Sequence, residues 1–435
     1  MKSVGIIGLG YVGLPLAIQS AQKGYKVIGY DIDSLIVKNI NERINPFVND
    51  ERFSNAFVSV SSSLFHATSE LSELSNVDVV VICVPTPTAN KIPDLTIVED
   101  AARSVATILK TGQLILLEST VSPGVTRRIV LDILESSTGL KVGRDFNLAY
   151  CPERIDPGNQ KLYVGNLNRV VGGITKDCSQ KAIEFYSSII DAEIVKLDST
   201  EEAEFVKSWE NSHRNVMIAL ANSAAIICDA VGMNIDNVLR GLQSKVDQFG
   251  LSLAKPGIGP GGHCIPEDIH FVIKNAREYG VDTKFLDDAS EVNDKMPYYA
   301  VDQLSEMVNK NDEKLKNLNV LLLGLAYKPN VNDLRRSPAV EMGYILSREA
   351  KKLFVHDQYV KLNSSIVPGA EIVTDLKSIL KDVDIVVIGC AHDEYLVKGL
   401  ITKSNSKVRY IYDGRNCLDA EAIKKEDILY KGVGK

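Results

Sequence analysis

The start of the chain contains a pattern that few folds can accommodate. A short apolar run at 4–7 leads directly into Gly8-Leu-Gly10-Tyr-Val-Gly13, and residues 14–23 then show helical spacing of apolar residues. A second apolar run at 26–30 ends at Asp31. The glycine motif alone would be weak evidence. Between two strands, with a helix and a terminal acid, it predicts a dinucleotide-binding βαβ unit.

The same residues predict which dinucleotide binds. The motif glycines let the backbone approach a pyrophosphate, and the N-terminus of the following helix supplies partial positive charge. Asp31 can accept hydrogen bonds from ribose hydroxyls and repels a 2′-phosphate, so we expect NAD rather than NADP. The expected cofactor-binding residues are Gly8, Gly10, Tyr11, Val12, Gly13, Asp31, Thr86 and Thr120.

Three loops that follow later strand-like runs extend this site. Val84-Pro-Thr-Pro87 and Glu118-Ser-Thr-Val-Ser-Pro-Gly124 place Thr86 and Thr120 where ligands bind in such sheets, beyond the carboxyl ends of the strands. Helix capping is the alternative, and it is the commoner use of threonine after a strand. Glu153, in the third loop, is a candidate acid/base or water-positioning group, with a surface glutamate as the alternative.

The centre of the chain contains one long helical pattern. It begins at the capping box Ser199-Thr-Glu-Glu202 and continues to about Val231, where Gly232 ends it. Thirty residues make roughly 45 Å of helix, which can join two domains and carry a dimer interface. The stretch 216–230 is almost wholly apolar or small, which predicts burial on more than one side.

Three polar residues of this helix share one face. Lys207, Asn211 and Arg214 are separated by offsets of four and seven from the first. A solvated polar stripe is the alternative reading. Phe205 and Trp209 lie in the same segment, which argues against plain surface.

The stretch Lys255-Pro-Gly-Ile-Gly-Pro-Gly-Gly-His-Cys-Ile-Pro-Glu-Asp268 is too rich in glycine and proline for a helix or a central strand. It carries a lysine, the Cys264 thiol and the Asp268 carboxylate. Cys264 is a candidate nucleophile, although free cysteines are mostly just buried and thiol chemistry needs partners from elsewhere. His263 can assist the thiol or simply pack against the backbone.

The last part of the chain repeats the alternation of strand and helix, which again indicates a parallel sheet. Its first strand-like run, 320–323, leads into Gly324 and Ala-Tyr-Lys328. Ser337-Pro338 begins a helix, and Arg335 beside that helix N-terminus suits a phosphate. Solvated arginines are the alternative.

Composition argues against several classes of function. The chain has 435 residues, a formal net charge of −7 and no long unbroken apolar run, so we expect neither a nucleic-acid partner nor a membrane span. Seven cysteines without a CxxC pair and six histidines without metal-ligand spacing predict reduced thiols and no metal. With no room for a signal peptide before the first strand, a cytoplasmic location is expected.

Seven separated motifs resemble the UDP-glucose/GDP-mannose dehydrogenase family over essentially the whole chain. They are Gly8-Leu-Gly-Tyr-Val-Gly-Leu-Pro15, Val84-Pro-Thr-Pro87, Glu118-Ser-Thr120, Cys151-Pro-Glu153, Glu202-Ala-Glu-Phe-Val-Lys207 with Asn211, Gly261-Gly-His-Cys264 to Asp268, and Ala326-Tyr-Lys328 to Arg335-Arg-Ser-Pro338.

The resemblance implies an α/β fold with two Rossmann-like parallel-sheet domains joined by a central helical domain. Residues 1–198 would bind NAD, and 313–435 would bind a UDP-sugar. Residues 199–312 would carry the cysteine loop and the long helix, through which the chain would form a homodimer.

The resemblance also implies a reaction, the four-electron oxidation of the C6 hydroxymethyl of a nucleotide sugar through a thioester. By motif, Cys264 would be the nucleophile, and Lys207, Asn211 and Asp268 would surround it. Thr120 and Glu153 would position water or transfer protons. The expected substrate-binding residues are Glu153, Lys207, Asn211, Arg214, Lys255, Gly261, Lys328 and Arg335.

Two positions depart from patterns of the family, the first of them from its glucose-specific branch. Pro157 replaces a second glutamate, and Glu267 stands where many relatives have lysine. Pro157 makes glucose a less favoured substrate, and three segments resemble the branch that acts on UDP-N-acetylhexosamines: Cys151-Pro-Glu-Arg-Ile-Asp-Pro-Gly-Asn159, Gly261-Gly-His-Cys-Ile-Pro266 and Met296-Pro-Tyr-Tyr299. The resemblance implies a UDP-N-acetylglucosamine 6-dehydrogenase of polysaccharide or glycan biosynthesis, with UDP-N-acetylmannosamine and UDP-glucose as alternative substrates. A two-electron hydroxyacid dehydrogenase would not need Cys264, and a non-catalytic NAD-binding protein would need none of the catalytic positions.

Overall fold

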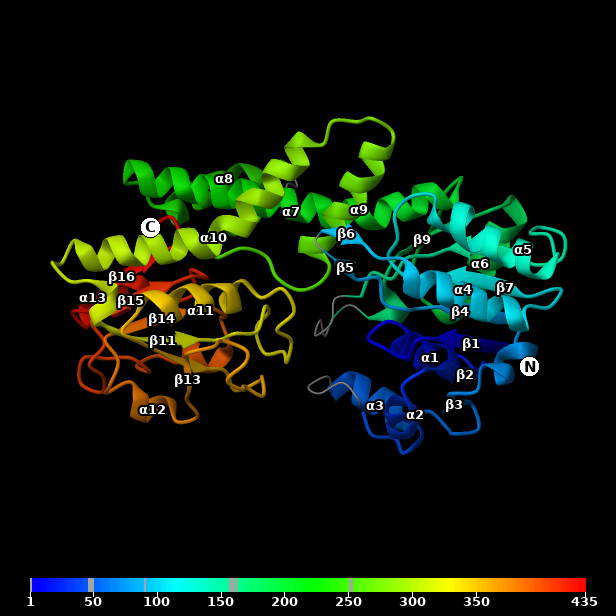
Figure 1. The fold of residues 1–435 in the computed structure, drawn as a ribbon, viewed down its shortest axis with the longest axis horizontal. Coiled ribbons are helices and arrows are strands. Elements are labelled where there is room, and N and C mark those ends of the chain that lie inside the picture. The colour runs from blue at the N-terminus through cyan, green and yellow to red at the C-terminus, as the bar shows by residue number, and fades with distance from the viewer. Residues whose placement is uncertain (1, 46–50, 90, 156–160, 162, 250–252) are drawn as a thin grey trace. The chain divides into compact units, whose positions relative to one another are not determined.

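The computed structural model describes residues 2–45, 51–89, 91–155, 161, 163–249 and 253–435. They form two compact units (Figure 1). The first contains Met1–Glu210 and His270–Val281, and the second contains Asn211–Ile269 and Asp282–Lys435. The helices α7 (Thr200–Val231) and α9 (Ile265–Glu278) each begin in one unit and end in the other.

The first unit is built on an eight-stranded sheet in the order β10-β9-β8-β7-β4-β1-β2-β3. From β3 to β8 all neighbours are parallel, whereas β9 runs antiparallel to β8. The strands are β1 (Ser3–Ile7), β2 (Lys26–Tyr30), β3 (Phe65–Thr68), β4 (Val79–Ile82), β7 (Leu114–Leu117), β8 (Asn147–Tyr150), β9 (Arg169–Gly173) and β10 (Ile194–Lys196), with a small antiparallel pair β5 (Thr88–Ala89) and β6 (Ile92–Pro93).

Helices cover both faces of this sheet. The helices α1 and α6 pack against one face, and α4 and α5 pack against the other, so that β4, β7 and β8 are wholly buried, as parallel strands usually are. The helices are α1 (Gly13–Gln22), α2 (Ser34–Asn41), α3 (Glu51–Ser59), α4 (Thr96–Ile108), α5 (Leu131–Thr138) and α6 (Lys176–Ile189).

The second unit contains a six-stranded sheet, parallel throughout, in the order β13-β12-β11-β14-β15-β16. Its strand order reverses between β11 and β14, as that of the first sheet does between β1 and β4, which creates a binding position at each reversal. The strands are β11 (Asn319–Leu323), β12 (Lys352–His356), β13 (Glu371–Ile372), β14 (Ile385–Ile388), β15 (Tyr410–Asp413) and β16 (Leu429–Gly432).

Two layers of helix enclose this second sheet. The helices α10 and α11 pack on one face and α12 on the other, as their labels in Figure 1 show. The predicted start of α11 is confirmed, because Ser337 caps it and Pro338 opens it. The helices are α8 (Ile235–Phe249), α10 (Lys284–Asn309), α11 (Pro338–Glu349), α12 (Leu376–Ile379) and α13 (Ala420–Lys425).

The long central helix α7 (Thr200–Val231) also forms as predicted. Its capping box is present, since Ser199 Oγ accepts from Glu202 N at 3.1 Å and Glu202 Oε2 accepts from Ser199 N at 3.2 Å. The predicted burial of 216–230 on several sides is wrong for the single chain. Leu220 and Ile227 are 63% and 58% exposed, so the described residues do not cover this apolar stripe.

In the described part of the chain, α7 is also the one helix long and apolar enough to cross a membrane by length and composition. A single such helix is weak evidence, since core helices pass the same test. The predicted fold class is confirmed: two Rossmann-like parallel sheets with a central helical region. The domain boundaries drawn at 198 and 312 stay a prediction.

Candidate active site

The turn between β1 and α1 has the geometry that a dinucleotide pyrophosphate needs. A Cβ at Gly13 would lie 1.9 Å from the Gly8 carbonyl oxygen, so only glycine lets the helix pack this closely on the strand. A Cβ at Gly10 would meet nothing within 4 Å, which leaves open space over the turn. The first turn of α1 has no side-chain cap and no acidic residue, so its amides remain suited to an anion.

Asp31 lies directly after β2 and closes the same turn. Its Oδ2 accepts from Leu9 N at 2.8 Å and its Oδ1 from Asp33 N at 2.9 Å. A carboxylate has about four acceptor positions, so two remain for ribose hydroxyls. These residues therefore fit the predicted NAD.

Thr86 lies in the loop after β4 and Thr120 in the loop after β7, and both side chains are partly exposed. Ser119 Oγ donates to Val84 O at 2.8 Å and ties the two loops together. The capping alternative is not realised, because the helices that follow are preceded by Leu95 and Val125 rather than by either threonine. Thr86 and Thr120 thus remain candidates for ligand contact.

Glu153 is buried, which excludes the alternative that it is an ordinary surface glutamate. Its Oε1 accepts from the backbone N–H of Arg154 and Ile155 at 2.6 and 2.5 Å, and its Oε2 accepts from Arg169 at 2.9 Å. All three contacts are donors to a carboxylate and suit its ionised form. Pro157, the departure predicted nearby, lies outside the described residues.

The cysteine loop ends at α9 (Ile265–Glu278), so Cys264 immediately precedes a helix N-terminus, whose partial positive charge favours an anion. The thiol is partly exposed, and its Sγ lies 3.4 Å from His263 Nε2. Asp268, one turn into α9, is buried and accepts from Asn211 Nδ2 at 2.6 Å. The fold thus brings three predicted catalytic residues, Cys264, Asp268 and Asn211, to one place in the second unit.

The cysteine loop is docked onto two loops of the second sheet. Gly262 N donates to Arg335 O at 2.9 Å, and a Cβ at Gly261 would lie 2.6 Å from Tyr327 Cβ. This close approach requires glycine at position 261. The predicted substrate-binding loop 326–337 therefore lies directly against the loop that carries Cys264.

Arg415, after β15, makes the second docking contact and was not predicted from the sequence. Its Nη1 donates to Gly259 O at 3.1 Å and its Nε to Gly389 O at 2.8 Å, while its Nη2 is buried without a hydrogen-bond partner among the described residues. A buried guanidinium with an unused donor suits an anionic ligand. The run Asp413-Gly-Arg415 after an apolar strand was the available signal.

Glu267 forms an ion pair across this docked surface. Its Oε1 lies 3.4 Å from Arg336 Nε, which joins the first turn of α9 to the 326–337 loop.

Exchanging the charges of Glu267 and Arg336 tests whether this ion pair contributes to substrate binding. Glu267→Lys or Arg336→Glu alone should lower kcat/KM for the sugar nucleotide up to about fivefold, the effect of losing about 1 kcal/mol at a partly exposed pair.

The double variant Glu267→Lys/Arg336→Glu restores opposite charges and should recover most of that loss. Steady-state kinetics and thermal unfolding of all four proteins form a complete cycle. Additive losses in the double variant would show that the two side chains do not act as a pair.

The remaining predicted residues are more scattered. Lys207 lies one helical turn before Asn211 on α7 and is partly exposed, and Lys328 is also partly exposed. Arg214 and Lys255 are exposed. Arg335 is exposed and pairs with Asp333 at 2.6 Å. Their contacts with a substrate stay predictions.

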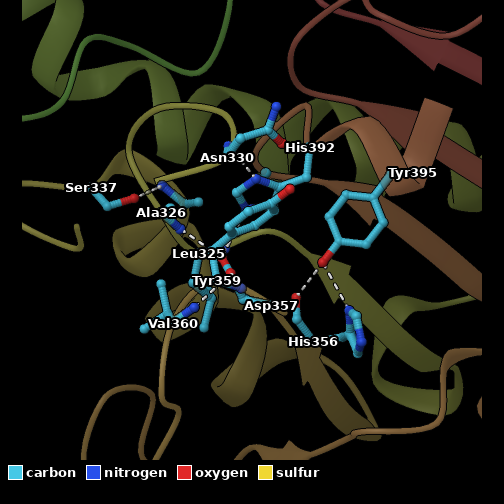
Figure 2. A network of polar contacts seen from close by, with 12 residues as sticks. Leu325, Ala326, Asn330, Ser337, His356, Asp357, Tyr359, Val360, His392 and Tyr395 are labelled. Atoms are coloured by element: carbon cyan, nitrogen blue, oxygen red, sulfur yellow. Dashed lines mark hydrogen bonds and ion pairs between the residues drawn. The ribbon is translucent and has the colours of Figure 1, made fainter. Parts of the chain in front are cut away.

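A polar network holds the base of the 326–337 loop at the reversal point of the second sheet (Figure 2). Asp357 Oδ2 accepts from Leu325 N, Ala326 N and His392 Nε2 at 2.8, 2.9 and 3.1 Å. Asn330 N donates to His392 Nδ1 at 2.8 Å, so the proton of this imidazole lies on the side of Asp357. The network fixes the loop that contains Lys328.

Comparison with known proteins agrees with this arrangement. Residues 2–190 match the NAD binding domain of the UDP-glucose/GDP-mannose dehydrogenase family, 201–295 match its central domain, and 321–420 match its UDP binding domain. A UDP-N-acetyl-D-mannosamine dehydrogenase of Pyrococcus horikoshii is 32% identical over 99% of both chains. Its solved structure covers 100% of this chain and 99% of its own with a TM-score of 0.89.

Two further relatives carry related names. A UDP-N-acetyl-D-mannosamine dehydrogenase of Escherichia coli is 33% identical over 95% of this chain and 98% of its own. A solved NDP-N-acetyl-D-galactosaminuronic acid dehydrogenase of Methanosarcina mazei is 29% identical, covers 100% of this chain and 95% of its own, and has a TM-score of 0.85. The chain belongs to the UDP-glucose/GDP-mannose dehydrogenase family, whose members it matches in all three domains.

Proposed function

We propose that the chain oxidises the C6 hydroxymethyl of UDP-N-acetyl-D-mannosamine to the carboxylate in two NAD-dependent steps. The observation that carries the four-electron reaction is Cys264 at the start of α9, with the Asn211–Asp268 pair one turn away. A two-electron dehydrogenase has no use for a thiol at this position, whereas oxidation of an aldehyde needs a nucleophile that first adds to it.

Each residue then has a chemical task. NAD, held at the β1–α1 turn and by Asp31, would supply the acceptor for one hydride at each oxidation. The first oxidation gives an aldehyde, to which Cys264 Sγ adds as the aldehyde oxygen gains a proton. Loss of the second hydride turns this thiohemiacetal into a thioester, and water cleaves the thioester to carboxylate and free thiol. Lys207 supplies positive charge for the developing oxyanion, and Glu153 accepts the proton of the attacking water.

The identity of the sugar differs from the expectation drawn from the sequence. The predicted preference for N-acetylglucosamine is not confirmed, and the names of relatives that match along nearly their full length favour N-acetylmannosamine. UDP-N-acetylglucosamine and UDP-glucose remain the alternative substrates.

The experiment is a panel of UDP-sugars incubated with the protein and NAD, in which NADH formed is counted per sugar consumed. We expect the highest kcat/KM for UDP-N-acetylmannosamine and two NADH per sugar. A ratio of one NADH would exclude the thioester route. Preferred turnover of the glucosamine epimer would instead reassign the sugar and leave the chemistry intact.

The exposed apolar stripe of α7 supports the predicted homodimer. Leu220, Ile227 and Val231 are each more than half exposed in the single chain, and covering such a stripe with its own copy would remove it from water. Sedimentation equilibrium of the wild type should give twice the mass of the chain, and the Leu220→Glu variant should have the mass of a single chain. A monomeric wild type would contradict the proposal. We also propose a cytoplasmic location, because the seven cysteines, all of them among the described residues, are not joined in disulfides.

A further inference from the structure

Behind Glu153 lies a buried ion cluster that the proposed chemistry has not used. Arg169, the first residue of β9, is fully buried, and its Nη1 donates to Glu118 Oε2 at 3.0 Å while its Nη2 donates to Glu153 Oε2 at 2.9 Å. Glu118 Oε1 also accepts from Tyr186 OH at 2.5 Å. One guanidinium thus joins two carboxylates from different loops.

These two loops carry two of the candidate residues of the first unit, Thr120 and Glu153. Glu118 stands directly after β7 and two residues before Thr120, and Glu153 follows β8. Arg169 also donates from Nη1 to Pro152 O at 3.4 Å, which holds the backbone beside Glu153. The guanidinium therefore fixes the distance between the Thr120 loop and the Glu153 carboxylate.

Burying this cluster costs free energy, and its two carboxylates outnumber its single guanidinium. Removing three ions from water costs several kcal/mol each before their attraction offsets it, and apolar packing often serves stability equally well. With both carboxylates ionised, one cation faces two anions. Burial raises the pKa of Glu118 to about 7, with Arg169 opposing the shift and Glu153 adding to it. Glu118 therefore gains and loses its proton near neutral pH.

We propose that Arg169 and Glu118 are positioning residues for the thioester hydrolysis: Arg169 fixes the Glu153 carboxylate, and the charge of Glu118 sets how readily Glu153 takes the proton of water. The inference rests on the proposed function. In this step the water oxygen bonds to the thioester carbon, the carbon–sulfur bond breaks, the sulfur leaves as thiolate, and Glu153 holds the proton.

The sign of the effect follows from the charge balance. When Glu153 takes a proton, Arg169 loses one of its two anionic partners. An ionised Glu118 then keeps the guanidinium neutralised, so the protonated state of Glu153 is accessible. A neutral group at position 118 leaves Glu153 as the sole counter-ion, which makes it a weaker base.

Among the described residues, the charged and titratable groups that face Glu118 belong to the same cluster, while Arg154, which pairs with Glu210, acts on Glu153 and Arg169 from its edge. Cys83 and Cys151 are fully buried thiols whose pKa values burial raises, and both stay neutral over the working range. Burial likewise keeps Tyr186 neutral by raising its pKa. The facing groups are Arg169 from β9, Tyr186 from α6, Cys83 after β4, and Cys151 and Glu153 after β8.

The test compares Glu118→Gln with the wild type across pH 5.5–8.5, using the substrate that gives two NADH with the wild type. Glutamine imitates the protonated acid, so the ratio of wild-type to variant kcat should be near one at the acid end and rise to roughly tenfold above pH 8. Taking a ratio cancels the titration of Cys264 and other shared groups. The variant should also accumulate sugar on Cys264, visible as added mass after quenching.

Tyr186→Phe is the matched control, because it removes a buried hydrogen bond to Glu118 and leaves every charge in place. Because the Tyr186 hydrogen bond lowers the pKa of Glu118, this variant should only move the midpoint of the pH profile upward, and its kcat should return to the wild-type value above that midpoint. A Glu118→Gln ratio that is flat with pH, whether one or ten, would overturn the inference and leave a structural role. Since the wild type must first show two NADH per sugar, failure of the proposed function is seen separately.

Should Glu118→Gln not fold, Arg169→Lys tests the link from the other side. An ammonium keeps the charge but is a single point that cannot bridge two carboxylates as the guanidinium fork does. We expect slow hydrolysis with a normal rapid formation of the first two NADH. Slowing of the first oxidation instead, with no accumulated covalent species, would contradict the assignment.

Discussion

Replacing Cys264 with serine should reduce uronate formation roughly a thousandfold or more, the scale on which removal of a catalytic nucleophile acts. A serine hydroxyl is hardly ionised at neutral pH, so it adds poorly to the aldehyde. NAD should still bind with an unchanged dissociation constant, because the β1–α1 turn lies in the other compact unit. Product analysis and an NAD titration measure the two effects separately.

Cys417→Ser is a suitable control for this experiment. Cys417 is the other cysteine of the described residues that is not fully buried, and it also lies in the second unit. Burial and Asp413 raise the pKa of its thiol, which therefore stays protonated. The control should retain wild-type turnover. Substantial uronate formation by the Cys264 variant would exclude this thiol as the nucleophile.

The second large effect is expected at Gly13, where alanine should prevent α1 from packing on β1. The added Cβ would overlap the Gly8 carbonyl oxygen, and relieving that overlap should cost about 3 kcal/mol. This corresponds to a fall in Tm of roughly 6–12 °C for a unit of this size. NAD affinity should fall at least tenfold, because the displaced turn no longer presents its amides to the pyrophosphate.

Gly10→Ala separates packing from cofactor binding. Its Cβ would meet no protein atom within 4 Å, so the free protein should keep its Tm while NAD binding weakens through contact with the pyrophosphate. Differential scanning calorimetry with and without NAD distinguishes the two variants. An unchanged Tm for Gly13→Ala would show that the turn adjusts to the extra methyl group.

Features that depend on nearby residues could be predicted from the sequence. The β1–α1–β2 unit, the capping box of α7 and the Ser337–Pro338 start of α11 each follow from a local pattern, and the structure contains them all. The proximity of Asn211 and Asp268 followed from a family motif rather than from spacing. The apolar face of α7 was read as buried because a sequence does not show whether a fold or a second copy covers it.

Contacts between distant parts of the chain could not be predicted in this way. Arg169 reads as an ordinary residue at a strand end, and its role depends on Glu118, which lies 51 residues away. Arg415 contacts Gly259 across 156 residues. The sequence shows that Glu267 departs from many relatives but gives no reason for it; in the structure this carboxylate pairs with Arg336.

Six strands of the first sheet follow the same order as the six strands of the second, and each sheet has an aspartate directly after its second strand, but the two aspartates differ in how many donors they already accept from. Asp357 already accepts from five donors, the three on Oδ2 and the backbone N–H of Tyr359 and Val360 on Oδ1, whereas Asp31 accepts from two. A carboxylate with every lone pair engaged has none for a ribose. We therefore expect one dinucleotide site per chain. Under the proposed function the two oxidations would use this site in turn, with the cofactor exchanged between them, and the covalent bond to Cys264 would hold the half-oxidised sugar during the exchange.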